Sequence, residues 1–204
     1  MKLMYKVIDL TSDTDTTKEN IGLSHGFYNS NRCNIKTSNE LTLENIQNID
    51  TDMILNNTDI IIGGPPCYKY TPFGEMHADP ENIFISYKRI LETMKPKIFI
   101  FANPVFTIDM FHGRLLKTIT TELEQLGYTI THLVTNDKDY KTGVNTQRFF
   151  LVGTLGEYSF DFPTSNEKIK FHNGSKISPI PEKLSEQIAH KVIKTLDTHS
   201  ELFM

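Results

Sequence analysis

The sequence predicts an α/β fold in which helices cover both faces of a sheet. Over the first 150 residues, short apolar runs alternate with longer amphipathic stretches, which is typical of βαβ units and a parallel sheet. The runs are apolar at most positions, as expected of strands that are buried on both faces. A chain of 204 residues, 38% of them hydrophobic and 23% charged, fits one ordinary globular domain.

The expected strands are short runs rich in Val, Ile and Phe, the residue types that are enriched in buried strands. Cys33 is interpreted as a buried or half-buried small residue at the start of one more strand. The clearly apolar runs cover residues 6–10, 59–62, 97–101, 129–134 and 149–153.

The expected helices carry apolar side chains at intervals of three or four residues. One covers residues 83–94, and another covers residues 113–126 and stops at Gly127. A last helix, residues 182–196, follows a proline-containing segment. Before it lies a polar stretch at residues 154–173, which is typical of a loop.

Charge and cysteine content exclude several classes of protein. With 21 Lys and Arg against 25 Asp and Glu the net charge is −4, which argues against a broad basic face for nucleic acid but leaves room for a local patch. Two cysteines are too few for a disulfide framework or a zinc ribbon, and no Cys/His spacing predicts a metal site. Without a signal-like N-terminus or an apolar run near the roughly 18 residues of a membrane span, we expect an intracellular protein, cytoplasmic or nuclear.

The most informative segment is the strand at residues 59–62 and the turn that follows it. The turn reads Gly63-Gly64-Pro65-Pro66-Cys67, so it delivers a thiol at the carboxyl end of a buried strand, where α/β sheets bind ligands. Glycine permits unusual backbone angles and proline stiffens the turn. A cysteine held in this way is a candidate nucleophile, which we favour over a buried small apolar residue.

This segment resembles motif IV of the cytosine-C5 methyltransferases. In that family the cysteine adds to C6 of a flipped-out cytosine, which makes C5 nucleophilic toward the methyl group of S-adenosylmethionine (SAM). The resemblance implies a Rossmann-like class I methyltransferase sheet with helices on both faces. It also implies that Cys67 is the nucleophile, supported by Pro66, that SAM is the cofactor, and that DNA or another cytosine-containing nucleic acid is the partner.

The resemblance extends along most of the chain in the correct order. Residues 95–105 resemble motif VI, residues 136–153 the motif VIII region, and residues 174–179 with the following helix motif X. The resemblance therefore implies two further catalytic residues, Asn103 and Arg148. It implies cofactor contacts from Asp9, Leu10, Asp59 and Pro65.

The cofactor loop departs from the family pattern. Asp9-Leu10 is followed by no glycine before Gly22, although the family has a glycine-rich loop there. Asp13 and Asp15 would repel the SAM carboxylate, so the sequence predicts a weakened cofactor site.

The catalytic motifs also depart from the family pattern. The family's motif VI glutamate aligns with Ala102, and losing such an acid costs about 10²–10⁴-fold in rate. Of the motif VIII pattern Gln-x-Arg-x-Arg, which aligns with Val144, Thr146 and Arg148, only the last arginine is present. This arginine could bind phosphate or pair with a carboxylate, and so could Arg114. His77 and His112 are interpreted as surface residues, not as replacement acids.

A target-recognition domain is not expected. Residues 154–173 stand where the family inserts that domain, and so short a stretch cannot fold by itself. We therefore expect residues 1–204 to form a single domain similar to the family's catalytic domain. A small basic cluster, interpreted as a solvated loop face, lies near this stretch at Lys168, Lys170, His172 and Lys176.

Two functional hypotheses follow, with a third that is weaker. The first is a non-catalytic relative of the family that acts by binding nucleic acid, a methyltransferase subunit or a second copy of itself. The second is a minimal active SAM-dependent enzyme that uses Cys67 as nucleophile and takes its specificity from a partner subunit. The third is a SAM-independent reaction that starts with thiol addition to C6, such as hydrolytic deamination.

Overall fold

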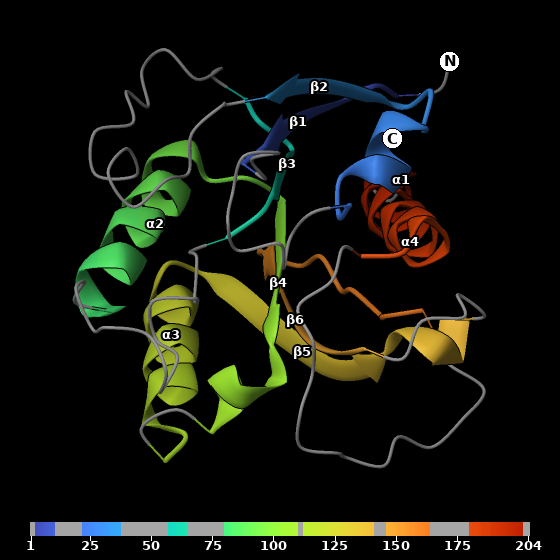
Figure 1. Cartoon of the computed structure of the whole chain (residues 1–204). Coiled ribbons are helices and arrows are strands. Elements are labelled where there is room, and N and C mark those ends of the chain that lie inside the picture. Colours follow the sequence, from blue (N-terminus) through green and yellow to red (C-terminus); the bar gives the residue numbers. More distant parts are fainter. Residues whose placement is uncertain are drawn as a thin grey trace.

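The computed structural model describes residues 3–10, 22–37, 57–64, 80–109, 112–140, 146–163 and 180–201. Within these residues, six strands form one sheet in the order β2-β1-β3-β4-β6-β5, with helices on both of its faces (Figure 1). The α/β fold class predicted from the sequence is therefore confirmed. The strands are β1 (Tyr5–Asp9), β2 (Cys33–Thr37), β3 (Ile60–Ile62), β4 (Ile98–Pro104), β5 (Tyr128–Asn136) and β6 (Gln147–Leu155).

Strand β2 is the one strand of this sheet for which the sequence indicated only a starting residue. It pairs in parallel with β1, so that Cys33 lies opposite Tyr5, and Cys33 is half-buried as expected. Its Asn34 and Lys36 side chains are exposed, since β2 is an edge strand. Polar residues on an exposed edge strand weaken the apolar pattern by which a strand is detected.

The parallel pairing that the βαβ pattern predicts holds for four strands but not for β6. Strands β2, β1, β3 and β4 are parallel, but β6 runs antiparallel to both of its neighbours, β4 and β5. A parallel pair requires a crossover of a dozen or more residues, usually through a helix. Only residues 137–146 connect β5 to β6, and they include the short 3-10 helix η3 (Asp137–Tyr140), so the chain returns in the opposite direction.

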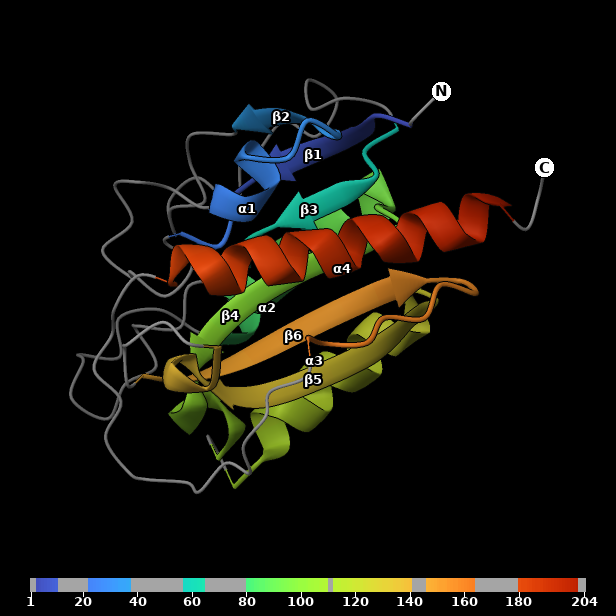
Figure 2. The same cartoon turned by 90° about the vertical axis from the view of Figure 1, so that its right-hand side faces the viewer.

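One face of the sheet is covered by α1 (His25–Tyr28) and α4 (Glu182–Glu201). Figure 2 shows α4 lying in front of the sheet and running along the strands. Because side chains alternate along a strand, Ile60, Ile62 and Ile100 point to this face and form a core with the apolar side of α4. The structure extends α4 to Glu201, beyond the end expected at residue 196.

The opposite face is covered by α2 (Pro80–Met94) and α3 (Arg114–Gln125), close to the predicted ranges. Tyr87 of α2 contacts the rings of Phe99 and Phe101 edge-on, with centroids 6.2 and 5.7 Å away. Its hydroxyl donates a hydrogen bond to the carbonyl of Gly63 at 3.0 Å. Among the described residues, no helix is both long and apolar enough to cross a membrane.

Helix α4 is joined closely to the segment that follows β1. The Ser185 hydroxyl accepts a hydrogen bond from the Gly26 amide and donates one to the Leu23 carbonyl, both at 2.7 Å. A Cβ atom on Gly26 would lie 2.4 Å from the Ser185 carbonyl oxygen, so only glycine allows this close approach. The C-terminal helix therefore packs beside the segment that joins β1 to β2.

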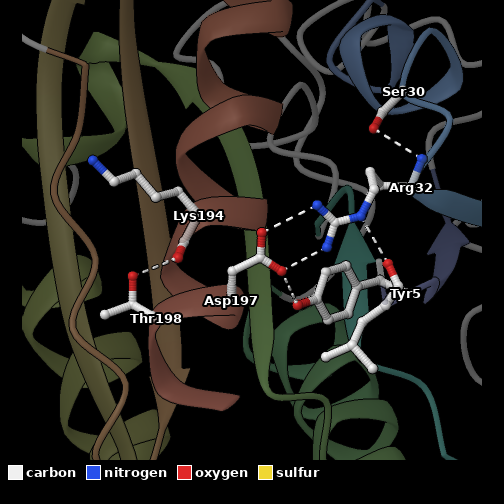
Figure 3. Close-up of polar contacts among 7 residues, drawn as sticks. Tyr5, Ser30, Arg32, Lys194, Asp197 and Thr198 are labelled. Atoms are coloured by element: carbon white, nitrogen blue, oxygen red, sulfur yellow. Dashed lines mark hydrogen bonds and ion pairs between the residues drawn. The ribbon is translucent and has the colours of Figure 1, made fainter. Parts of the chain in front are cut away.

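A second contact joins the far end of α4 to β1 and β2 (Figure 3). The Tyr5 hydroxyl donates to Asp197 at 2.6 Å, and Arg32 forms a two-pronged ion pair with the same carboxylate. The Arg32 Nε also donates to the Leu3 carbonyl at 2.8 Å. The hydrogen bonds that Arg32 donates to the Asp197 carboxylate raise the pKa of Arg32. Helix α4 is therefore held by polar contacts near both of its ends, to the α1 segment at its start and to the β1–β2 edge at its end.

Candidate nucleic-acid site at the carboxyl edge of the sheet

The six strands of the described sheet all have one end at the same edge. Strands β1 to β5 end there and the antiparallel β6 begins there, so Arg148 lies between Pro104 of β4 and Thr135 of β5. Ligands of open α/β sheets bind at this edge. We therefore expect the site residues that the sequence indicated to lie at this edge.

The expected nucleophile Cys67, with Pro65 and Pro66, lies outside the described residues. The structure places the chain that leads to it. Gly63, at φ +95°, donates its amide hydrogen to the Ile100 carbonyl at 2.8 Å, and a Cβ atom on Gly64 would lie 2.3 Å from the Phe101 side chain. Both glycines are thus required for the chain to leave β3 beside β4.

Asp9 and Leu10 lie at the carboxyl end of β1, where the resemblance implies a cofactor contact. Both side chains are only 3% exposed, and the Leu10 amide donates to the Ile62 carbonyl at 2.8 Å. Residues 11–21, which include Asp13 and Asp15, lie outside the described residues. The described part of this strand end therefore offers a ligand almost no side-chain surface.

Asp59 is not brought to this edge. It directly precedes β3, so the length of that strand separates it from the carboxyl edge. There it accepts a hydrogen bond from the Lys6 amide at 2.9 Å and forms an ion pair with Lys97 at 2.7 Å. This position opposes the cofactor contact that the resemblance implies and favours a role in fixing the starts of β1, β3 and β4.

Strand β4 delivers Ala102 and Asn103. Ala102 is buried among the apolar residues on the α4 side, whereas Asn103 alternates to the other face. Asn103 is 4% exposed, and its Oδ1 atom has no hydrogen-bond partner within the described residues, which is also true of the Thr107 hydroxyl in the following η2 (Val105–Ile108). An unpaired buried polar group costs about 1–3 kcal/mol, so such an acceptor is a candidate to meet a ligand.

Arg148 is engaged by a carboxylate that the sequence reasoning did not single out. Its Nε donates to Asp137 Oδ1 at 2.9 Å and to Oδ2 at 3.0 Å, and its Nη2 donates to Oδ2 at 2.8 Å. Arg148 is 4% exposed and Asp137 is 0% exposed. Burial raises the pKa of the Asp137 carboxyl, and the hydrogen bonds from Arg148 oppose that rise. In the β5–β6 register Asn136 lies opposite Gln147, so Asp137 and Arg148 lie close together. The pair could be predicted only once that register was known.

The remaining sequence-level candidates divide into described and undescribed residues. His112 is exposed, as interpreted, at φ 57°, and Arg114 is exposed at the start of α3. Thr146 is buried, and its carbonyl oxygen accepts a hydrogen bond from the Asp137 amide at 2.9 Å. Outside the described residues lie His77, Val144 and the basic cluster Lys168, Lys170, His172 and Lys176.

Curated relatives match parts of this chain. The type II methyltransferase M.FnuDI of Fusobacterium nucleatum is 30% identical over 125 residues, which cover 57% of this chain and 36% of that protein. The type II methyltransferase M.HaeII of Haemophilus aegyptius is 32% identical over 108 residues, which cover 52% and 34%. The matched region thus spans about a third of the length of these relatives.

Solved structures share the fold at low sequence identity. The Entamoeba histolytica methyltransferase EhMeth superposes with a TM-score of 0.56 at 17% identity, over 82% of this chain and 58% of that one. A mutant of Spodoptera frugiperda DNMT2 gives a TM-score of 0.57 at 14% identity, over 86% and 57%. This similarity shows that the chain has the Rossmann-like methyltransferase fold.

The sequence model of one family spans nearly the whole chain. It is described as C-5 cytosine-specific DNA methylase, and it matches residues 18–202. The match includes the strand that leads to Cys67, the β4 segment, the β5–β6 pair and α4. The chain belongs to the C-5 cytosine-specific DNA methylase family.

Proposed function

We propose that this chain is a non-catalytic member of its family that acts by binding. Its partner is DNA or another cytosine-containing nucleic acid, or a methyltransferase subunit that needs a second catalytic-type domain. Self-association through a second copy is a variant of the same role. We also propose an intracellular location.

The observation that carries this proposal is Ala102. The family's glutamate at this position hydrogen-bonds the target cytosine and assists protonation at N3, and an alanine methyl group can do neither. Ala102 is buried in the apolar core under α4. Asp137, the fully buried carboxylate of the same edge, is committed to Arg148. Neither position thus supplies a proton donor for N3.

The end of β1, where the family resemblance implies a cofactor contact, also supports a non-catalytic role. SAM, when bound to a family member, supplies the methyl group, and its carboxylate must be accommodated near the end of the first strand. Here Asp9 and Leu10 present almost no surface, and the sequence places two more carboxylates, Asp13 and Asp15, in the following loop. These residues do not fit a SAM molecule well, because like charges would face each other.

The alternative is a minimal active SAM-dependent cytosine-C5 methyltransferase with Cys67 as its nucleophile and specificity from a partner subunit. Two observations favour it. A binding scaffold has no evident need for a thiol after Gly63 and Gly64, two glycines that the backbone of this turn requires. In addition, the unpaired Asn103 Oδ1 could accept a hydrogen bond from a bound base.

Calorimetric titration with SAM tests the cofactor site. The proposal expects no binding with a Kd in the micromolar range. A micromolar Kd would overturn the non-catalytic assignment and favour the minimal enzyme.

An oligonucleotide with 5-fluorocytosine tests the nucleophile in the presence and absence of SAM. The non-catalytic role expects no covalent adduct by mass spectrometry. An adduct that disappears in Cys67→Ala but persists in Cys33→Ala would contradict it, because Cys33 is the chain's other cysteine and is half-buried in β2. An adduct without SAM binding would point to SAM-independent chemistry.

A further inference from the structure

Tyr87 of α2 lies at the point where the chain leaves β3. Its side chain is 0% exposed, and its hydroxyl donates a hydrogen bond to the Gly63 carbonyl at 3.0 Å. Gly63 is the first residue after the strand, and its amide donates to the Ile100 carbonyl of β4 at 2.8 Å. Both backbone polar groups of Gly63 are therefore bound, one by the neighbouring strand and the other by a helix on the face of the sheet.

The ring of Tyr87 supports the next residue of the same turn. It contacts the ring of Phe101 edge-on, with centroids 5.7 Å apart. A Cβ atom on Gly64 would lie 2.3 Å from that Phe101 ring, so the backbone of Gly64 packs directly on it. Gly63 adopts φ +95°, a conformation that glycine permits. The turn is therefore held by a hydrogen bond from α2 and by close packing on a side chain that Tyr87 contacts.

We propose that Tyr87 is a positioning residue that fixes the direction in which the chain leaves β3 toward Cys67. Only two residues separate Gly64 from Cys67, and both are prolines, whose φ angle is locked. Few rotatable backbone bonds therefore lie between the anchored turn and the thiol. The inference concerns how the thiol is presented, which matters for a binding role and for a catalytic one, so it goes beyond the proposed function.

The test compares Tyr87→Phe with the unchanged protein by the rate at which iodoacetamide alkylates Cys67, measured by mass spectrometry. Phenylalanine keeps the ring that packs on Phe101 and removes only the hydroxyl. We expect the rate constant of Cys67 to move about fivefold toward its value in the urea-unfolded chain, since one buried neutral hydrogen bond is worth about that factor. Cys33, which is half-buried in β2, should keep its rate in the same molecules.

Amide hydrogen exchange measures the turn itself. The Gly63 amide, which is bound to the Ile100 carbonyl, should exchange about fivefold faster in Tyr87→Phe, because the hydroxyl no longer holds the same residue. The Asp59 amide donates to the Lys6 carbonyl just before β3, at the opposite edge of the sheet, and should keep its exchange rate.

Tyr128→Phe is the matched control. Tyr128 is also buried, its ring contacts Phe99 with centroids 5.0 Å apart, and its hydroxyl donates to the Pro96 carbonyl at 3.0 Å. Pro96 precedes β4 and so lies at the opposite edge of the sheet from the Gly63 turn. The control therefore loses the same kind of hydrogen bond at a distant place. It should leave alkylation of Cys67 within about twofold of that in the unchanged protein, because distant sites act independently.

Circular dichroism first establishes that both variants are folded. Equal changes in Tyr87→Phe and Tyr128→Phe would overturn the proposal, because a general loss of stability would then explain them. A folded Tyr87→Phe in which either Cys67 alkylation or Gly63 exchange is unaltered would do the same. So would an unchanged protein whose Cys67 already reacts as fast as in the unfolded chain, since the turn would then not position the thiol. The SAM and 5-fluorocytosine experiments test the proposed function separately.

Discussion

Arg32 and Asp197 form a two-pronged ion pair that joins the start of β2 to the last turns of α4. The Nη1–Oδ2 distance is 3.1 Å and the Nη2–Oδ1 distance is 2.6 Å. Figure 3 shows Tyr5 reaching the same carboxylate from β1. The pair is partly exposed, so its contribution to stability is smaller than that of a buried pair.

We predict that Asp197→Asn lowers the free energy of unfolding by about 1 kcal/mol, because it weakens the three charge-assisted hydrogen bonds that Arg32 and Tyr5 donate to this carboxylate at a partly solvated site. Urea denaturation at low and high salt measures this loss, which should shrink at high salt. The control is Asp161→Asn, an exposed carboxylate that forms no ion pair with another of the described residues. A loss of the same size in the control would mean that the Arg32–Asp197 ion pair makes no specific contribution to stability.

We expect removal of the Ser185 hydroxyl to lower the free energy of unfolding more than Asp197→Asn does. Ser185→Ala leaves the Gly26 amide and the Leu23 carbonyl without their partner in a buried contact. We predict a loss of about 2 kcal/mol, since each buried group left unsatisfied costs about 1–3 kcal/mol. Urea denaturation measures it against Ser159→Ala, an exposed serine whose replacement should stay within about 0.5 kcal/mol. Equal effects would contradict the role of Ser185 in holding α4.

Replacing Asn103 by leucine should affect the stability of the fold differently from replacing Asn136 by leucine. Asn103→Leu removes a buried oxygen that has no partner within the described residues, so stability should stay within about 0.5 kcal/mol or rise. Asn136→Leu removes the acceptor of the Lys138 amide and should cost about 1–3 kcal/mol. Thermal unfolding of both variants checks the contrast. A clear loss in Asn103→Leu would show that its oxygen has a partner in the chain.

Two buried tyrosines predict a loss of stability at alkaline pH. Burial raises the pKa values of Tyr87 and Tyr128 above the ordinary value for tyrosine, and their hydroxyls donate to backbone carbonyls at 3.0 Å. The fold therefore favours their neutral form. This contribution is complete below the unfolded pKa of about 10 and decreases as the pH rises above it, because only the unfolded chain ionises readily.

Absorbance at 295 nm and circular dichroism during an alkaline titration check this prediction. Tyr87 and Tyr128 should ionise together with loss of the fold. Ionisation of every tyrosine before any change in circular dichroism would contradict it.

The sequence-based interpretation succeeded where local pattern and burial agree. The apolar runs at β3 and β4 are buried on both faces, so composition alone marks them as strands. The helices α2 and α3 show the apolar spacing of one covered face. By contrast, α1 is only four residues long and is held by Ser185, which is distant in the sequence. No local pattern of useful length exists for such a helix.

The site residues stay predictions. The motif order indicated the carboxyl edge and the residues Asn103 and Arg148, and the family match bears out the family that the motifs indicated. The sequence could not indicate the Asp137 partner, because that contact depends on the antiparallel register of β5 and β6. It also grouped Asp59 with the cofactor residues, although the start and the end of β3 lie at opposite edges of the sheet.

The sequence by itself determined the fold class, the family and the missing acid at Ala102, because these depend on residue types and their order along the chain. The absence of a target-recognition domain between residues 154 and 173 stays a prediction of the same kind. Only the tertiary structure decided the direction of β6, the place of Asp59 and the use of Arg148. These depend on which strands lie side by side, and long-range contacts such as that of Arg148 with Asp137 are set by strand register and burial.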